Sequence, residues 1–502
     1  MLPAPESRAL VPYHLSKPRR PYVEEERTLA SLGALDIFVE TNRTTLARTV
    51  LIRESTGDDR LYNTQLIRYK NMMRIDSDMS RWLDEMSSSP NPHVARWSKR
   101  LDRFYYSPED VEYNLMRDTA HKHWRRLRTQ LTFPDGSKAN AHELDSALDV
   151  EENPESRRKL YLNLHETNGK LLPLVFKLRD LQNNMARSQG YDNYFEYKLS
   201  GYNLKPIEVE QLLAEVWTII KPVDQQRVEA LRSFATGREL HPWDLPYLST
   251  LWKREQVRTI SESAFEDQLG IVKRVISQLG LRAGFDKLTI DEGNRQGKGS
   301  PSCITINPPH EFGIILGKAE KDARSLAVFF EEIGHGLHSS FISPSHPNVM
   351  RRIVDGSDLV WAEAMGSIFV NLMAENGVLN LDLSSRSDFE AWRVASLAQR
   401  LASLVACMIR LDFEKNFYAS DTNNPSELSR IWYKSNRKYN PIWESIPFDN
   451  IEEVHPWVND HYLVEKPVDT LSYVLADLYQ VQIETFARAH YNPLISTDLG
   501  FF

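Results

Sequence analysis

The sequence of 502 residues predicts a mainly helical fold with one small β-hairpin. Apolar residues recur at helical spacing over long segments, whereas segments with strand character are few. The two clearest strand candidates, 302–307 and 312–316, are separated only by Pro308, Pro309 and His310, which favours a hairpin. Helices are therefore expected to form most of the core, with the hairpin just before the helix that contains residues 329–341.

Composition and charge are those of an ordinary globular protein. Hydrophobic residues make up 41% and charged residues 26% of the chain, which is long enough to bury a large core. The 61 basic and 69 acidic residues give a formal charge of −8, spread along the chain rather than gathered in a basic stripe. We therefore expect no nucleic-acid partner.

The cysteines and the N-terminus bear on the compartment. Cys303 and Cys407 are the only cysteines, and neither belongs to a paired motif, which favours a reducing compartment and two small buried side chains. The N-terminus contains no continuous apolar segment, so we expect no secretory signal, no membrane partner and a cytoplasmic location.

The helices of the first half are predicted in chain order. Helical spacing indicates a helix over 111–131, then a continuous helical segment over 154–188 and a further helix over 207–234. The turn before the last of these places the boundary between an N-terminal helical lobe, 1–204, and a catalytic lobe, 205–502. We expect the two lobes to interleave, with the chain crossing between them near the tryptophan- and proline-rich stretch 241–246.

Residues 329–341 read F-F-E-E-I-G-H-G-L-H-S-S-F and carry the most informative polar residues. Glu331, His335 and His338 share one face of the predicted helix, and burying Glu331 beside Glu332 costs free energy unless a cation, a proton or a donor compensates. We therefore interpret this face as a functional site rather than a solvated surface. Apolar residues at steps of three and four form the opposite, buried stripe: Leu326, Phe330, Ile333, Leu337 and Phe341.

A second helix, predicted over 361–373, carries Glu363 near its start. The chain between His335 and Glu363 is long enough for a loop and a return helix that brings this carboxylate to the same site. A glutamate at a helix start is also stabilised by the helix dipole. Spacing alone therefore leaves both roles open.

The two helices resemble a known metal site. E-E-I-G-H resembles an H-E-x-x-H zinc motif, and with W-A-E-A-M-G-S-I-F it is similar to the paired metal helices of the thimet oligopeptidase and oligoendopeptidase F group of gluzincin metallopeptidases, and more distantly to angiotensin-converting enzyme. By position, His335 matches the second histidine ligand, Glu332 the general base and Glu363 the glutamate ligand. Glu331 stands where that family has its first histidine, so the motif is degenerate.

Further segments carry the same resemblance. Residues 178–197 are similar to a helix and G-x-x-N-Y turn of these oligopeptidases, and 295–307 to their substrate-flanking strand. His461 and Tyr473 lie twelve positions apart, as do the family's side chains that steady the oxyanion, while Thr470 replaces a second tyrosine. Without the resemblance, His461 is more typical of a partly buried histidine and Tyr473 of an aromatic residue that packs in a helix.

The resemblance implies a two-lobed, zincin-like helical fold that encloses a deep channel, with the hairpin beside the active-site helix. It also implies an oligopeptidase-like hydrolase acting on short peptides. A set of Glu331, His335 and Glu363 can still bind zinc or manganese, but two anionic ligands make the metal a weaker acid catalyst. Without a metal, repulsion among the carboxylates raises their pKa and allows proton exchange at neutral pH.

We therefore predict an enzyme that performs acid–base chemistry, as hydrolysis, elimination or cyclisation, on a short peptide or peptide-like small molecule without a normal zinc centre. Glu331, Glu332 and His335 are the predicted acid–base groups, and His461 and Tyr473 stabilise developing negative charge. One alternative is an active metallo-oligopeptidase with Glu331 as a metal ligand. Another is a non-catalytic peptide-binding protein.

Overall fold

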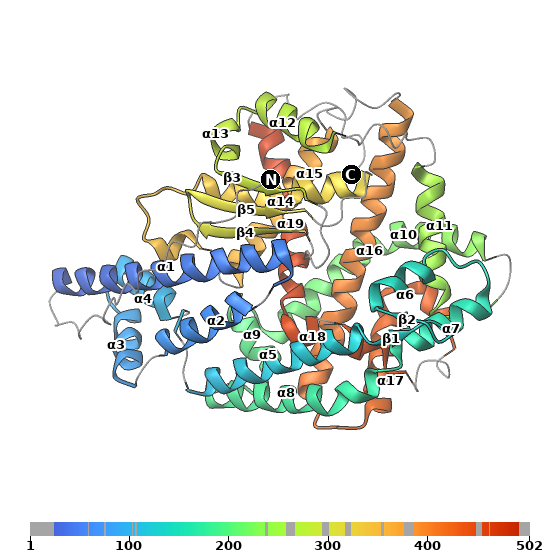
Figure 1. Ribbon diagram of the computed structural model, residues 1–502, viewed down its shortest axis with the longest axis horizontal. Coiled ribbons are helices and arrows are strands. Elements are labelled where there is room, and N and C mark those ends of the chain that lie inside the picture. The colour runs from blue at the N-terminus through green and yellow to red at the C-terminus, as the bar shows by residue number, and fades with distance from the viewer. Residues whose placement is uncertain are drawn as a thin grey trace.

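Helices dominate the computed structural model, as the sequence predicts, and the sheets are small (Figure 1). The structure describes residues 25–490 except 59, 75–76, 103, 106–107, 236–238, 258–266, 294–300, 317–322, 353–355, 376–385, 448–453 and 461. None of the helices within these ranges is long and apolar enough to span a membrane.

The elements follow one another as short and long helices around two small sheets. The first half contains α1 (Glu25–Thr56), α2 (Arg60–Met72), α3 (Ser77–Ser87), α4 (Pro92–Asp102), α5 (Pro108–Arg128), β1 (Leu131–Thr132), β2 (Lys138–Ala139), α6 (Ala141–Leu148), α7 (Pro154–His165), α8 (Asn168–Ser188), α9 (Tyr194–Ser200), α10 (Pro206–Phe234) and α11 (Asp244–Val257). The second half contains α12 (Gln268–Gln278), α13 (Arg282–Phe285), β3 (Leu288–Asp291), β4 (Ser302–Asn307), β5 (Glu311–Ile315), α14 (Ala323–Ser340), η2 (Asn348–Arg351), α15 (Ser357–Glu375), α16 (Arg386–Ala419), α17 (Pro425–Tyr439), η4 (Pro441–Ser445), η6 (Pro456–Asn459), α18 (Tyr462–Glu465) and α19 (Thr470–His490).

The predicted hairpin is confirmed as β4 and β5, which pair antiparallel with Cys303 opposite Ile314. Strand β3 pairs parallel with β5, so the sheet has the order β3-β5-β4. Because successive residues of a strand point to opposite faces, the sheet can be covered on both sides.

Helices α1 and α14 cover the two faces of this sheet (Figure 1). Ile304 and Ile306 of β4 cluster with Leu51 of α1, and Ile314 of β5 clusters with the apolar stripe of α14. The contact with α1 is close at Gly313, where a β-carbon would lie 2.5 Å from Cδ1 of Leu51. The sheet thus holds α14 in a fixed place.

Several predicted helices are confirmed and two details are wrong. The predicted helices over 111–131 and 207–234 are α5 and α10. The continuous segment 154–188 is instead two helices separated by a turn at 166–167, after which Asn168 donates hydrogen bonds to the backbone carbonyls of Val454 and His455. Phe341 is 56% exposed, since α14 ends at Ser340 before the stripe is complete.

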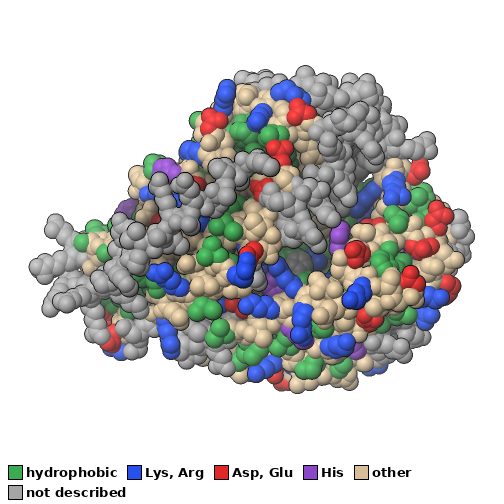
Figure 2. Space-filling model, viewed as in Figure 1, with side chains coloured by type: hydrophobic (Ala, Val, Ile, Leu, Met, Phe, Trp, Pro, Cys, Tyr) green, Lys and Arg blue, Asp and Glu red, His purple; other side chains and the backbone are tan. Residues whose placement is uncertain are grey.

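The largest apolar core joins α5, α8, α9 and α10 to α16, α17 and α19. Helix α19 packs against both α15 and α16 and thereby connects this core to the helices beside the sheet (Figure 1). Figure 2 shows the molecular surface from the same side as Figure 1. The surface is hollowed near the middle of this view, with basic and histidine side chains at the hollow. The division into lobes at 204 and 205 remains a prediction, and α10 begins directly after it at Pro206.

Both cysteines are free thiols, Cys407 buried and Cys303 partly buried. Burial raises the pKa of both thiols, and the nearby Glu332 carboxylate adds to the rise at Cys303. Neither thiol is therefore a ready nucleophile.

Candidate active site

Helix α14 presents the motif residues because its opposite face is held in the core. Phe329, Phe330, Ile333 and Leu337 of this helix are fully buried. The residues between them, Glu331, Glu332 and His335, are only partly buried and lie on the side away from that core. The amphipathic pattern thus places two carboxylates and an imidazole within one helical turn.

A close contact between two glycines brings α15 to the same place. A β-carbon on Gly334 would lie 3.0 Å from Cα of Gly366, so the two backbones approach more closely than larger residues allow. This contact sets Glu363 beside His335. Because α15 begins at Ser357, before the predicted start at 361, Glu363 lies in the second turn of the helix rather than near its start. The predicted second helix and its position next to the first are therefore confirmed.

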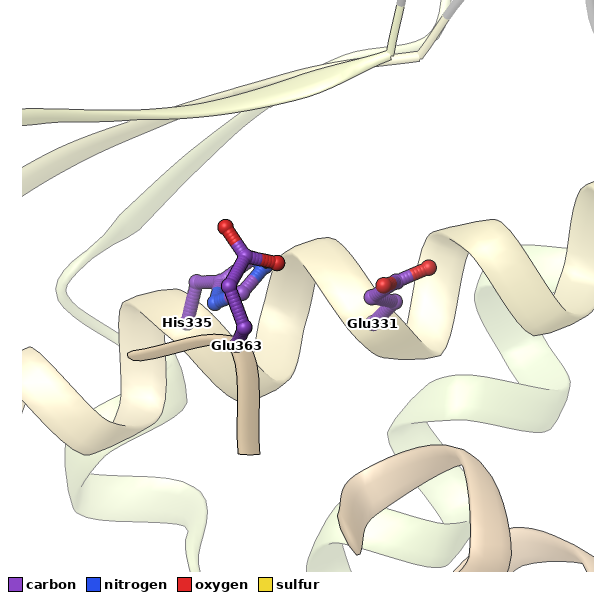
Figure 3. A group of neighbouring side chains, drawn as sticks. All are labelled: Glu331, His335 and Glu363. Carbon is purple, nitrogen blue, oxygen red and sulfur yellow. The ribbon is translucent and has the colours of Figure 1, made fainter. Parts of the chain in front are cut away.

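Glu331, His335 and Glu363 form one group (Figure 3). One potential ligand atom from each lies within 4.8 Å of the others. Nε2 of His335 is 3.9 Å from Oε2 of Glu363, and Nδ1 of His335 lies 2.9 Å from the backbone carbonyl of Ala362. Because a carbonyl oxygen only accepts, the proton is on Nδ1 and the lone pair of Nε2 faces the carboxylates.

The carboxyl groups of the site hold their protons more firmly than usual. Burial, reinforced by the charges of Glu331 and Glu363, raises the pKa of Glu332 to about 8, although a hydrogen bond from the Cys303 backbone and the charge of Lys466 oppose this. Burial raises the pKa of Glu363 to about 7, again opposed by Lys466. At neutral pH the site is therefore far less negative than its three carboxyl groups suggest.

Glu331 and His335 are shifted by each other as well as by burial. Burial raises the pKa of Glu331 and the charge of Glu363 adds to this, while His335 and Arg400 lower it. Burial lowers the pKa of His335 despite the favourable charge of Glu331, so the imidazole is neutral. A neutral imidazole with a free Nε2 can accept a proton or bind a metal.

Helix α14 packs directly against strand β4, and the charge of Glu332 contributes to the raised pKa of the Cys303 thiol on this strand. The prediction that the hairpin lies beside the active-site helix is therefore confirmed.

Tyr473 reaches the site from α19. Burial raises its pKa, and the charge of Glu363 and a hydrogen bond with Tyr462 contribute to the rise. The rings of Tyr462 and Tyr473 meet edge to face, with their centroids 6.1 Å apart. Tyr473 is therefore a protonated donor near Glu363, where the sequence places it.

The remaining residues that the sequence analysis considered lie in different surroundings. His461 lies outside the described residues, so its role remains a prediction. Thr470 is fully buried at the start of α19 and its hydroxyl finds no hydrogen-bond partner among the described residues. His338 is partly buried with its pKa lowered by burial and by His335, and His310 is exposed on the hairpin turn.

Two cations of the site were not predicted from the sequence. The charge of Lys466 lowers the pKa of Glu332 and Glu363, and the charge of Arg400 of α16 lowers the pKa of Glu331. Arg400 is itself paired with Asp477 of α19 at 2.5 Å. Both cations come from segments far from the motif helix, and the signal that could have located Lys466 is its position between His461 and Tyr473.

The three-residue group fits a divalent cation. It offers two carboxylates and one imidazole, a donor set that suits zinc or, because it is rich in oxygen, manganese. The hydrogen bond to Ala362 orients His335 for this purpose, as outer hydrogen bonds do for metal-binding histidines. Gly366 leaves room for the ring, since a β-carbon there would lie 3.0 Å from Nε2 of His335.

Comparisons with known proteins concern the fold and part of the sequence. The profile of peptidase family M3 matches residues 147–287. A structure of PZ peptidase A with an inhibitor superposes with a TM-score of 0.70 and 14% identity, covering 94% of this chain and 86% of that one. A structure described as an oligoendopeptidase F superposes with a TM-score of 0.68 and 14% identity, covering 93% and 84%. No curated protein matches the sequence.

The structural similarity covers nearly the whole chain, whereas the sequence similarity covers a shorter part of it. The superpositions extend over both halves of the chain, whereas the family match ends before the motif helix α14. The resemblance of this chain to the thimet oligopeptidase and oligoendopeptidase F group of M3 peptidases is thereby confirmed, in fold over almost its entire length and in sequence over residues 147–287.

Proposed function

We propose that the protein is an enzyme with an altered metal site that performs acid–base chemistry on short peptides or peptide-like small molecules without a normal zinc centre. The observation that carries this proposal is the raised pKa of Glu332, about 8, in a group that also contains Glu331, His335 and Glu363. A carboxyl that keeps its proton at neutral pH can donate it and take it back during a reaction.

Each residue of the group has a role in this proposal. Glu332 donates and accepts the proton, and neutral His335 is the second proton acceptor through Nε2. Glu363 holds the imidazole in place from the side of α15. Tyr473, which stays protonated, donates a hydrogen bond to negative charge that develops on the substrate, and His461 is proposed to do the same.

The scaffold supports a peptide as the substrate and hydrolysis as the first reaction to test. The superposed structures are peptidases, and one of them holds an inhibitor. Elimination and cyclisation need the same proton transfers at Glu332 and remain within the proposal. The free cysteines and the balanced charge favour a cytoplasmic enzyme without a nucleic-acid partner.

One specific observation favours a second candidate, an active metallo-oligopeptidase. The donor atoms of Glu331, His335 and Glu363 lie within 4.8 Å of one another and would hold the metal. A bound zinc or manganese ion would supply polarisation of a carbonyl and a more acidic water. Glu332 would then serve as the base beside the metal-binding group.

Peptide consumption in the presence and absence of metal separates these candidates. Purified protein is incubated with a pool of short internally quenched peptides, either after chelation or with added zinc or manganese, and the peptides are followed by fluorescence and mass spectrometry. We expect consumption that survives chelation and is lost in Glu332→Gln. Loss on chelation with recovery on metal addition would identify the metallopeptidase instead.

The third candidate, a non-catalytic peptide-binding protein, is tested by the same samples. It predicts that peptides bind without being consumed, and that Glu332→Gln and Tyr473→Phe leave binding unchanged. Either enzyme predicts a large loss of turnover in both variants.

A further inference from the structure

A chain of contacts links Arg410 of α16 to Tyr473, the proposed hydrogen-bond donor of the site. It begins with an ion pair between Nε of Arg410 and Oδ2 of Asp460, two side chains that are partly buried. Asp460 lies two residues before Tyr462, on the segment that leads into α18 and then α19. The ion pair therefore fastens this segment to α16.

Arg410 and Asp460 hold Tyr462 in two ways. Oδ1 of Asp460 accepts a hydrogen bond of 3.1 Å from the backbone N–H of Tyr462, the first residue of α18. The guanidinium carbon of Arg410 lies 4.7 Å from the centroid of the Tyr462 ring, a distance at which a cation and an aromatic ring attract each other. The backbone and the ring of Tyr462 are thus both held by the same ion pair.

Tyr462 in turn contacts Tyr473. The centroids of the two rings are 6.1 Å apart and their planes meet at 89°, so a turn of the Tyr462 ring would displace its neighbour. Helix α19, which carries Tyr473, packs against α15, which carries Glu363. The contacts therefore lead from an ion pair outside the catalytic group to the ring whose hydroxyl is proposed to act in it.

A small, partly open cavity lies beside this chain of contacts. Arg410, Glu414, Asp460 and Tyr462 line it together with hydrophobic side chains. The Tyr462 ring therefore borders free space on one side, and close packing alone does not fix its direction. The cation above the ring is well placed to determine how the ring lies.

A second contact from α16 holds the segment at its other end. One helical turn after Arg410, Oε1 of Glu414 accepts a hydrogen bond of 2.8 Å from the N–H of Val468. Val468 lies two residues before α19 begins at Thr470. Helix α16 therefore fixes both the ring beside Tyr473 and the start of the helix that carries Tyr473.

We propose that Arg410 is a positioning residue, which holds the hydroxyl of Tyr473 in its catalytic orientation through Tyr462. This inference rests on the proposed function, because the orientation matters only if Tyr473 donates to negative charge on the substrate. Arg410 does not touch the reacting atoms in this role. It stabilises the support behind the donor, and a donor that is fixed in advance stabilises a developing charge most strongly.

A double-mutant cycle tests the proposal through the rate of peptide consumption. Arg410→Met removes the cation and keeps most of the side-chain volume, and we expect it to lower kcat about tenfold while KM changes less than about twofold. Arg410→Lys, which keeps a cation, should retain most of the rate. In Tyr473→Phe the hydroxyl is already absent, so adding Arg410→Met should cause no further loss. Additive losses would overturn the proposal, because they would show that Arg410 acts independently of that hydroxyl.

Lys415→Met is the matched control. Lys415 also lies on α16 and pairs with Glu210 of α10 at 2.6 Å, so the variant breaks an ion pair of the same helix with a different partner helix. It should leave kcat unchanged with and without Tyr473→Phe. Thermal unfolding verifies that each variant is folded. If Arg410→Met is unfolded, Tyr462→Leu breaks the chain of contacts at its next member and should give the same non-additive loss.

A spectroscopic measurement separates this inference from the proposed function. A fluorine-labelled tyrosine is placed at position 473 of the full chain, and its fluorine NMR resonance is compared in the parent, Arg410→Met and Lys415→Met. We expect the resonance to move in Arg410→Met only, and an unchanged resonance there would overturn the inference whether or not peptide is consumed. Full kcat in Arg410→Met would overturn the inference and leave the proposed function standing. A parent that consumes no peptide would overturn the proposed function and the catalytic role of Arg410 together, even if the resonance moves.

Discussion

Gly366 of α15 lies directly against the imidazole of His335. A β-carbon at position 366 would be 2.7 Å from Cε1 and 3.0 Å from Nε2 of that ring, and 3.2 Å from Cγ of Glu331. The missing side chain therefore provides the space in which the imidazole and the first carboxylate of the group meet. Helix packing and site geometry depend on the same glycine.

Gly366→Ala should disturb the site more than the fold. The added methyl group gains helix propensity of about 1 kcal/mol but must displace His335, and overpacking of this kind costs about 1–3 kcal/mol. We expect a small loss of thermal stability and at least a tenfold loss of peptide consumption. Gly169→Ala of α8 is the control, since a β-carbon there meets nothing within 4 Å, and it should leave peptide consumption unchanged without lowering thermal stability.

Glu331→His should convert the group into a zinc site. The variant replaces one of two anionic donors by an imidazole one helical turn from His335, which completes a two-histidine, one-glutamate set with Glu363. We expect near-stoichiometric zinc by mass spectrometry of the purified variant and much less in the parent. Glu331→Gln, which removes the charge without adding an imidazole, should stay as low as the parent. Stoichiometric zinc or manganese in the parent would contradict our proposal and make Glu331 a ligand.

Local patterns predicted the hairpin and the motif helix. Pro308 and Pro309 mark the hairpin turn, and the apolar stripe of α14 places Glu331 and His335 on its other face. Both features depend on residues close together in the chain. The role of Glu363 could not be assigned from the local pattern, because a glutamate near a predicted helix start can either join the site or interact with the helix dipole. The resemblance supplied the choice between these roles.

Features that depend on distant segments could not be predicted. At the break between α7 and α8, Asn168 bonds to the distant backbone of Val454, and Glu332 of α14 lies near Cys303 of β4. The charges of Lys466 and Arg400 reach the site only after α16, α18 and α19 have packed. Periodicity reports which face of a helix is buried, and not which distant charge will face it.

Tyr473→Phe should abolish most of the activity while preserving the fold. The variant removes a protonated hydroxyl beside Glu363, and the loss of one donor to a developing negative charge lowers kcat by about 100-fold to 1000-fold. Peptide consumption and thermal unfolding are the measurements. Tyr479→Phe is the matched control on the same helix, because that ring is 39% exposed and packs on Trp361. Equal activity of the two variants would show that the Tyr473 hydroxyl has no role in the reaction.

Glu332 should make the protein less stable as pH rises. Its pKa is about 8 in the folded protein and 4.5 ordinarily, so between these values the folded state holds a proton that the unfolded state has released. The free energy of unfolding therefore falls as pH rises from 4.5 to about 8, and this contribution is complete above the upper value. Denaturant unfolding of Glu332→Gln should show a shallower fall over that window than the parent.

The control for this pH dependence is Glu229→Gln, on the exposed side of α10. It should follow the parent at every pH. Other carboxyls with raised pKa values, such as Glu363, contribute to the parent's slope, so the informative quantity is the difference between variant and parent. Parallel curves for Glu332→Gln and the parent would show that Glu332 is ionised in the folded protein at neutral pH.

Glu414 should stabilise the turn that carries Lys466. Val468 adopts a φ of 66°, which is unfavourable for a β-branched residue, and its N–H is bonded to Glu414. Burial raises the pKa of Glu414 to about 8, so the carboxyl is neutral at pH 7 and Glu414→Gln keeps the acceptor. We expect Glu414→Gln to stay within about 1 kcal/mol of the parent and Glu414→Ala to lose about 2–4 kcal/mol, because it leaves a cavity and a buried N–H without a partner. Denaturant unfolding measures both. Equal stability of the two variants would show that the left-handed turn at Val468 is held by other contacts.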